Sequence, residues 1–197
     1  MKTVLMASAV AALFATSAVA GDFDTNSVTL QFNRDNIVGK LGVTAGEVTD
    51  LSVGAYILPH SVLGADADVY VATTYGVVTE DLTFGATYGL QKKLGDKLTA
   101  YGSLEAAYTV ASGSTDGAWE VTPLAGASYA MNDKLSAFGE VSYAFDASND
   151  WAQDGGLVEV GVDYTVASGI FVRPSLTRSF DTGADETNAA LTVGLSF

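Results

Sequence analysis

The sequence predicts an all-β chain whose strands close into an antiparallel up-and-down barrel of about ten strands. Three observations support this fold class. The chain ends on Leu191, Val193, Leu195 and Phe197 with small or polar residues between them, which is the two-residue period of a strand with one apolar face. The same alternation recurs about every 15 residues between turn signals. Beyond the first 20 residues no helical periodicity appears.

The first 20 residues have the composition of a cleaved secretory signal peptide. Lys2 gives a basic start, residues 4–14 are almost entirely apolar, and Ala18-Val19-Ala20 forms an A-x-A cleavage site. The apolar run is shorter than the ~20 residues that a spanning helix needs, which favours cleavage over a membrane anchor. We therefore expect a signal peptide at 1–20 and one domain at 21–197, with eight basic and 23 acidic residues.

Without cysteine, an exported chain needs another source of stability, and a continuous hydrogen-bonded sheet provides one. Nine strands can be read from the alternation, at 51–58, 67–77, 82–90, 98–110, 119–130, 135–145, 157–166, 170–180 and 189–197. Each of them places Val, Leu, Ile, Ala or aromatic residues on one face and mainly Gly, Ser, Thr or charged residues on the other.

The N-terminal region is less regular. Val28, Leu30 and Phe32 share one parity, but Ile37 and Leu41 share the other. This inversion indicates either a bulge in one long strand or a hairpin between two strands, which would give ten or eleven strands in total. Because bacterial single-chain barrels have even strand numbers, we expect ten strands, a bulge and both termini at the periplasmic rim; eight or twelve strands stay open.

Connection length and charge sort together on this topology. The short connections 91–97, 131–134 and 167–169 fall on one rim and contain Lys92, Lys93, Lys97 and Lys134. The longer connections 111–118, 146–155 and 181–187 fall on the opposite rim and are acidic. Short turns are typical of the periplasmic rim of a membrane barrel, so the acidic rim is expected to face outward from the cell.

The two faces of the strands predict which side meets lipid. Aromatic residues gather near the strand ends of the apolar faces, as they do at membrane interfaces. A base that faces hydrocarbon at the midplane costs ~2–4 kcal/mol, and the mid-strand charges avoid the apolar face. The predicted lumen-facing charges are Lys40, Glu105, Glu120, Glu140, Glu159, Asp163 and Arg173. Arg173 lies on the strand next to Glu159 and Asp163, so an internal salt bridge is expected.

With its leader, its repeated amphipathic hairpins such as 129–135 and its terminal Phe197, the chain resembles the small outer-membrane β-barrel proteins of Gram-negative bacteria, the OmpA-like or porin-like barrels. The resemblance covers 21–197 and includes no periplasmic domain. It implies a transmembrane barrel in the bacterial outer membrane, in contact with membrane lipids and lipopolysaccharide. It also implies that Leu191, Val193, Leu195 and Phe197 form the signal read by the barrel assembly machinery, although Leu195 stands where a Tyr is common.

The favoured function is a structural or passive-permeability barrel, whose lumen is either a packed polar core or a narrow cation-preferring pore. The alternative is an outer-surface interaction or adhesion barrel that acts through its acidic loops. An enzyme is not expected, because His60 is the only histidine and lies in a predicted connection. No zinc-ligand spacing, P-loop or dinucleotide fingerprint is present, so we expect no catalytic residue, metal, cofactor or nucleic-acid partner. The sequence specifies neither a solute nor an oligomeric state.

Overall fold

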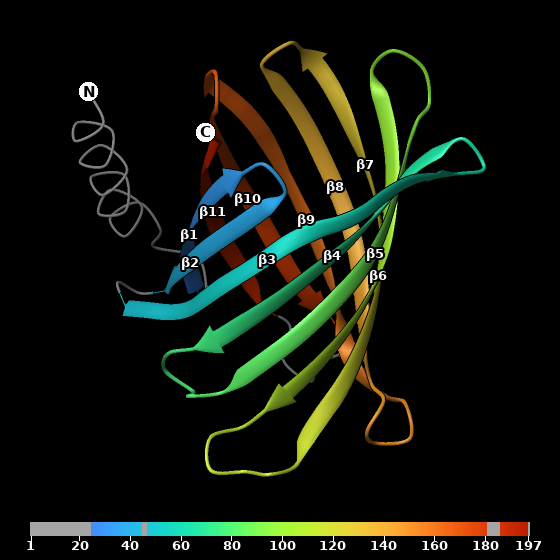
Figure 1. Cartoon of the computed structure of the whole chain (residues 1–197). Helices are drawn as coiled ribbons and strands as arrows, with labels where there is room; N and C mark the ends of the chain where they lie inside the picture. Colours follow the sequence, from blue (N-terminus) through green and yellow to red (C-terminus); the bar gives the residue numbers. More distant parts are fainter. Residues whose placement is uncertain (1–24, 45–46, 181–185, 197) are drawn as a thin grey trace.

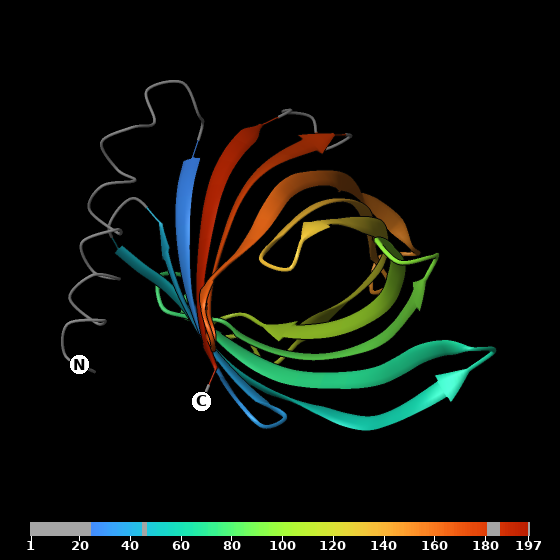
Figure 2. The same ribbon diagram turned by 90° about the horizontal axis from the view of Figure 1, so that it is seen from above.

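The computed structural model describes residues 25–44, 47–180 and 186–196, and these residues form one closed all-β barrel (Figures 1 and 2). Its strands are β1 (Thr25–Arg34), β2 (Ile37–Thr44), β3 (Glu47–Val62), β4 (Ala65–Gly76), β5 (Leu82–Lys93), β6 (Leu98–Val110), β7 (Gly117–Asn132), β8 (Leu135–Asp146), β9 (Ala152–Ala167), β10 (Ile170–Phe180) and β11 (Thr187–Ser196). Each strand pairs antiparallel with the next, and β1 closes the ring by pairing parallel to β11. No helix in these ranges is long and apolar enough to cross a membrane.

The described barrel has eleven strands rather than the expected ten, because the inversion near residue 35 is a hairpin and not a bulge. Val28 pairs with Val43 and Leu30 with Leu41, on either side of a turn at 35–36. Asp35 adopts a φ of 53°, a left-handed conformation that Asp tolerates better than most residues. An odd strand number makes the closing pair parallel. The start of β1 and the end of β11 therefore lie at opposite rims, and the expectation that both termini share one rim is wrong.

The end of β3 also differs from the sequence prediction. Pro59 and His60 belong to β3, and the turn to β4 follows at Leu63 and Gly64, whose φ angles are 52° and 75°. The pairing of β3 with β4 shifts between Ile57 and His60. Proline lacks a backbone donor, and a bulge lets a strand continue past such a residue.

The two rims differ in charge, as the sequence predicts. We call the rim that contains the end of β11 the C-terminal rim; it carries the turns at 35–36, 63–64, 94–97, 133–134 and 168–169 and lies at the top of Figure 1. Five of the eight basic residues beyond residue 20 lie at this rim: Arg34, Lys92, Lys93, Lys97 and Lys134. The opposite rim carries 77–81, 111–116 and 147–151 and is predominantly acidic, with Glu80, Asp81, Asp116 and Asp150 among its residues.

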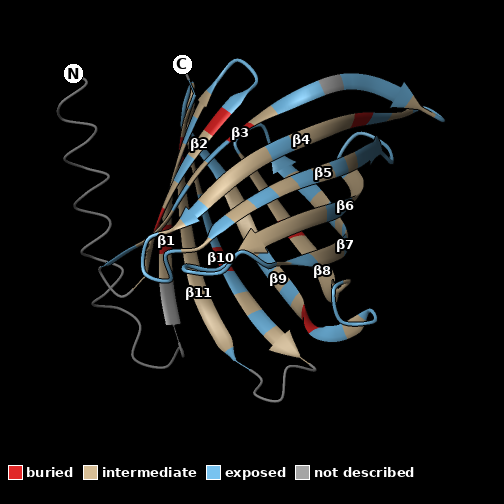
Figure 3. Cartoon of the chain, turned by 60° about the horizontal axis from the view of Figure 1, so that its bottom comes forward, coloured by how far each residue is buried: buried red, intermediate tan, exposed pale blue. Residues whose placement is uncertain are grey.

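The barrel has almost no buried apolar core within the described residues. Twenty-nine large apolar or aromatic side chains are exposed, whereas only Val28, Val38, Ala67 and Phe138 are buried apolar residues. Figure 3 accordingly shows intermediate and exposed residues along every strand and only isolated buried ones. Most of the exposed side chains, such as Leu104 and Val160, have the outward parity that the alternation predicts. The fold is therefore held mainly by its continuous hydrogen-bonded wall.

The parallel β1–β11 seam predicts a specific cross-link. Thr29 and Thr192 are register partners, and the chain has no native cysteine, so a Thr29→Cys/Thr192→Cys variant should form a disulfide on mild oxidation. Non-reducing gel migration of the unfolded chain would report the closed loop. In the control variant Gln31→Cys/Ala190→Cys, an antiparallel seam through Thr29 and Thr192 would bring the two cysteines together, whereas the parallel seam keeps them four positions apart. Cross-linking of the control alone would contradict the eleven-stranded topology.

Candidate functional site: the barrel lumen

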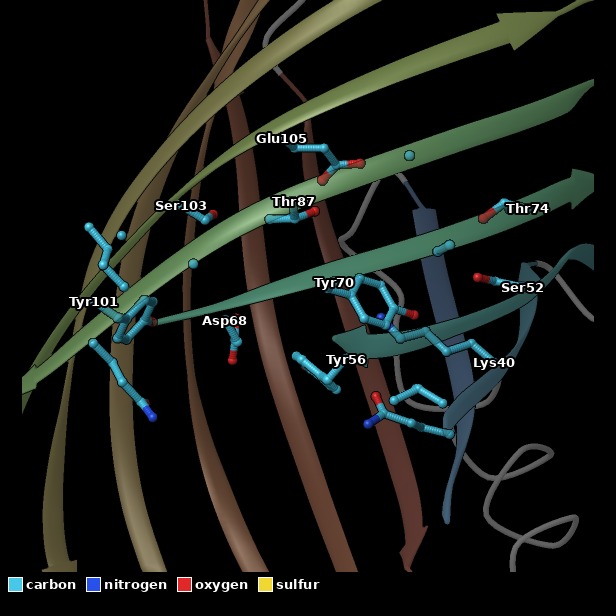
Figure 4. Close-up of a pocket in the computed structure, with 18 of the residues that line it drawn as sticks. Lys40, Ser52, Tyr56, Asp68, Tyr70, Thr74, Thr87, Tyr101, Ser103 and Glu105 are labelled. Carbon is cyan, nitrogen blue, oxygen red and sulfur yellow. The ribbon is translucent and has the colours of Figure 1, made fainter. Parts of the chain in front are cut away.

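The lumen contains a cavity of about 810 Å³ along one side of the barrel wall. Its lining side chains come from β1 to β6 and from β10 (Figure 4). Space exists there because inward positions in adjacent strands are occupied by small residues: Ala72 pairs with Gly85, and both line the cavity. The row of missing side chains leaves a hollow in the wall that an ordinary barrel interior would fill.

The cavity is lined by more acids than bases. Asp50, Asp66, Asp68 and Glu105 face it together with the two bases Lys40 and Arg173. Figure 4 shows Lys40, Asp68 and Glu105 on different strands around the same space. Charged side chains of excess negative sign attract cations into such a space and repel anions.

Four aromatic residues line the cavity: Tyr56, Tyr70, Tyr101 and Phe171. Tyr56 and Tyr70 are cross-strand partners on β3 and β4, with ring centroids 4.9 Å apart and planes tilted by 44°. The Tyr70 ring lies over Gly54, where a Cβ atom would overlap it. The ring therefore lies along the wall and leaves the cavity open.

Beside the cavity, several inward side chains contact one another. Arg173 Nε donates a hydrogen bond to Asp163 Oδ1 at 2.6 Å, and Nη2 donates to Oδ2 at 3.1 Å. The Arg173 guanidinium also lies 4.8 Å from the centre of the Phe138 ring. Phe138 and Ser175 are each 8% exposed. The expected salt bridge is thus present, with Asp163 as the partner of Arg173.

A second contact extends this packed region toward β6. The Tyr101 hydroxyl donates a hydrogen bond to Glu140 Oε2 at 2.8 Å, across the intervening strand β7. Gly126 makes this crossing possible, because a Cβ atom there would lie 2.6 Å from the Tyr101 ring and 2.8 Å from Glu140 Cβ. Phe138 likewise lies against Gly161, and Phe171 against Gly194.

The seven predicted lumen residues all occupy inward positions but lie in different surroundings. Lys40, Glu105 and Arg173 line the cavity. Asp163 and Glu140 lie behind cavity-lining residues, bonded to Arg173 and Tyr101 respectively. Glu120 accepts a hydrogen bond from Thr122 at 3.0 Å, and Glu159 is the register partner of Glu140. Neither Glu120 nor Glu159 lines the cavity.

Sequence reasoning missed several of the cavity-lining residues. Asp50 and Asp66 lay just outside the predicted strands. Asp68, Tyr56, Tyr70 and Tyr101 lay inside them with the parity of the polar face. Listing every residue of that face would have placed Asp68 and Tyr70 inward with Ala72.

The residues of the expected assembly signal lie only partly in the described chain. Leu191, Val193 and Leu195 pair with Val28, Leu30 and Phe32 across the seam. Phe197 lies outside the described residues, as do the predicted leader and its cleavage site.

His60 lies away from the cavity lining, near the C-terminal rim. Its Nε2 atom is 3.2 Å from the Tyr88 hydroxyl, and the two rings are 5.8 Å apart. Within the described ranges, no group of three or more His, Cys, Asp or Glu side chains has a metal-binding arrangement.

No protein-family model matches this chain, and no curated protein matches its sequence.

The inward glycines predict a matched pair of stability effects. Gly126→Ala should displace the Tyr101 ring and weaken its bond to Glu140, lowering the free energy of unfolding by about 1–3 kcal/mol. Gly85→Ala is the control, because the nearest atom to its new Cβ is Glu105 Oε1 at 3.4 Å, an ordinary contact. Urea unfolding of the folded protein, followed by tryptophan fluorescence, measures both. Equal destabilisation by the two variants would rule out the proposed packing role of Gly126.

Proposed function

We propose that this chain is an outer-membrane β-barrel protein that provides passive permeability through a narrow, cation-preferring lumen. The observation that carries the proposal is the inverted distribution of side chains, with exposed Val, Leu and aromatic residues outside and charged residues around an internal cavity. A water-soluble barrel has the reverse arrangement, because its apolar side chains fill the interior.

The height of the apolar band supports membrane insertion. Trp119 and Tyr129 both face outward on β7 and are ten residues apart. At ~3.3 Å per residue and a strand tilt of ~40°, ten residues cover ~25 Å along the barrel axis, the height of the apolar band in outer-membrane barrels. Tyr108 packs against Trp119 at one end with ring centroids 5.0 Å apart, and Lys97 Nζ lies 5.9 Å from the centre of the Tyr129 ring at the other. Aromatic and basic side chains of this kind suit the two interfaces.

The cavity and its charge support the permeability part of the proposal. Four acidic and two basic side chains line a polar space of about 810 Å³, which favours water and small cations over anions. Lipids and lipopolysaccharide are the surroundings that this barrel would contact, and the barrel assembly machinery would be its partner during insertion. In that setting the C-terminal rim, which carries most of the basic residues, faces the periplasm, and the acidic rim faces the cell exterior.

Two adjacent residues of β6 test the membrane assignment. Leu104 is 51% exposed on the outer face, and Ser103 lines the cavity. In lipid vesicles, Leu104→Arg should lower the free energy of unfolding by ~2–4 kcal/mol, because it places a base in the hydrocarbon region, whereas Ser103→Arg should cost far less. Heat-modifiable gel migration across a urea series reports the folded fraction of each. A larger loss for Ser103→Arg, or folding without detergent or lipid, would refute the assignment.

Planar-bilayer recording tests the permeability. The folded protein should give small ohmic conductance steps in KCl, and its reversal potential in a salt gradient should have the sign of a cation-preferring pore. A folded barrel with no conductance at any protein load would leave a purely structural role.

A further inference from the structure

We propose that the permeation path follows the cavity formed by β1 to β6 and β10, and that the charges lining it, Glu105 and Lys40 among them, set its charge selectivity while Glu140, Glu159 and Asp163 do not. This inference rests on the proposed permeability function and names the residues that would control it. Sequence alone treats all of these charges as equivalent members of one polar face.

The first step is the asymmetry of the wall. The side chains that line the cavity come from β1 to β6 and β10, and none of them belongs to the described parts of β7, β8 or β9. The small inward residues Ala72 and Gly85 are register partners and line the cavity, which explains the space on one side. On β7 to β9, Phe138 is buried, and a separate pocket of about 480 Å³ near the C-terminal rim is lined by Ser136, Asp163 and Thr165 among others.

The second step concerns the inward charges of β8 and β9. Both Asp163 carboxylate oxygens accept hydrogen bonds from Arg173, and Glu140 accepts one from Tyr101. A carboxylate compensated by such bonds attracts a passing ion less than an uncompensated one does. Glu159 lies next to Glu140 in the register and acts electrostatically on Arg173.

The third step concerns two of the charges that line the cavity. Lys40 makes no ion pair within 4.0 Å among the described residues, and Glu105 and Asp50 are the acids that act on it. Lys40 and Glu105 both line the cavity, on β2 and β6 (Figure 4). An ion that passes through this space meets these two opposite charges directly.

Reversal potentials in a KCl gradient separate the two sides. Glu105→Gln should lower the permeability ratio of K⁺ to Cl⁻ by about two-fold or more, and Lys40→Gln should raise it by a similar factor, because each removes one charge from the cavity lining. Glu159→Gln is the matched control: it makes the same chemical change at an inward residue outside the lining, and should leave the ratio nearly unchanged. Heat-modifiable migration verifies that each variant is folded.

Thiol accessibility provides a second measurement that does not depend on the charge variants. The chain has no cysteine, so Ser103→Cys in the cavity lining and Ser175→Cys at a buried inward position outside the lining are unique reporters. A small cationic methanethiosulfonate reagent should reduce the conductance of the Ser103→Cys pore and leave that of Ser175→Cys unchanged.

The outcomes distinguish the inference from the function on which it rests. If the wild-type protein conducts but Glu159→Gln shifts the reversal potential as much as Glu105→Gln, or Ser175→Cys is blocked as readily as Ser103→Cys, the one-sided path is wrong and the pore remains. If the folded wild-type barrel does not conduct, the permeability function fails and the path fails with it.

Discussion

Closure of the hydrogen-bonded ring is the constraint on which the rest of this structure depends. With few apolar side chains buried among the described residues, packing of a core cannot hold the strands in place. The wall is continuous only because β1 meets β11, from Thr25 opposite Asn188 to Asn33 opposite Ser196. Eleven strands make that meeting parallel, which satisfies the edge groups that two free strands would leave unpaired. The cost is that the two ends of the barrel chain lie at opposite rims.

The sequence predicts which residues of each strand face outward, but it does not determine which strand pairs with which in the N-terminal region. Period-two alternation placed Leu104, Val160 and Leu176 outward, and their exposure agrees. The inversion between Phe32 and Ile37 has the same sequence pattern for a bulge and for a hairpin, because both shift the parity by one. Only the pairing of Leu30 with Leu41 and of Leu30 with Val193 selects the hairpin. Pro59 was likewise predicted to lie in a connection, but a register shift between Ile57 and His60 lets β3 continue past it.

In the lumen too, the local sequence pattern predicts which face a residue lies on, whereas its neighbours depend on the strand register. Parity was sufficient to place Glu105 and Glu140 on the inner face. Their different surroundings depend on which residues lie beside them: Glu105 is the register partner of Thr87, in the wall of the cavity, whereas Glu140 meets the Tyr101 ring across Gly126. The sequence pattern of one strand does not show which residues of the adjacent strands lie beside it. It also gives no reason to expect that the rings of Tyr70 and Tyr101 lie over glycines of the adjoining strands.

The cost of enclosing charge links the cavity to the residues that line it. Asp163 and Arg173 compensate each other's charge, and the Phe138 ring lies against the guanidinium. Asp68 and Lys40 form no ion pair within 4.0 Å in the described chain, and charges without such compensation are tolerable only where water reaches them. The small residues Ala72 and Gly85 leave the room for that water. Larger apolar side chains in this hollow would exclude water from the charges. Without the charges, the hollow would not need to hold water. The open space and the uncompensated charges are thus two parts of one arrangement, and that arrangement favours a hydrated path on this side of the barrel.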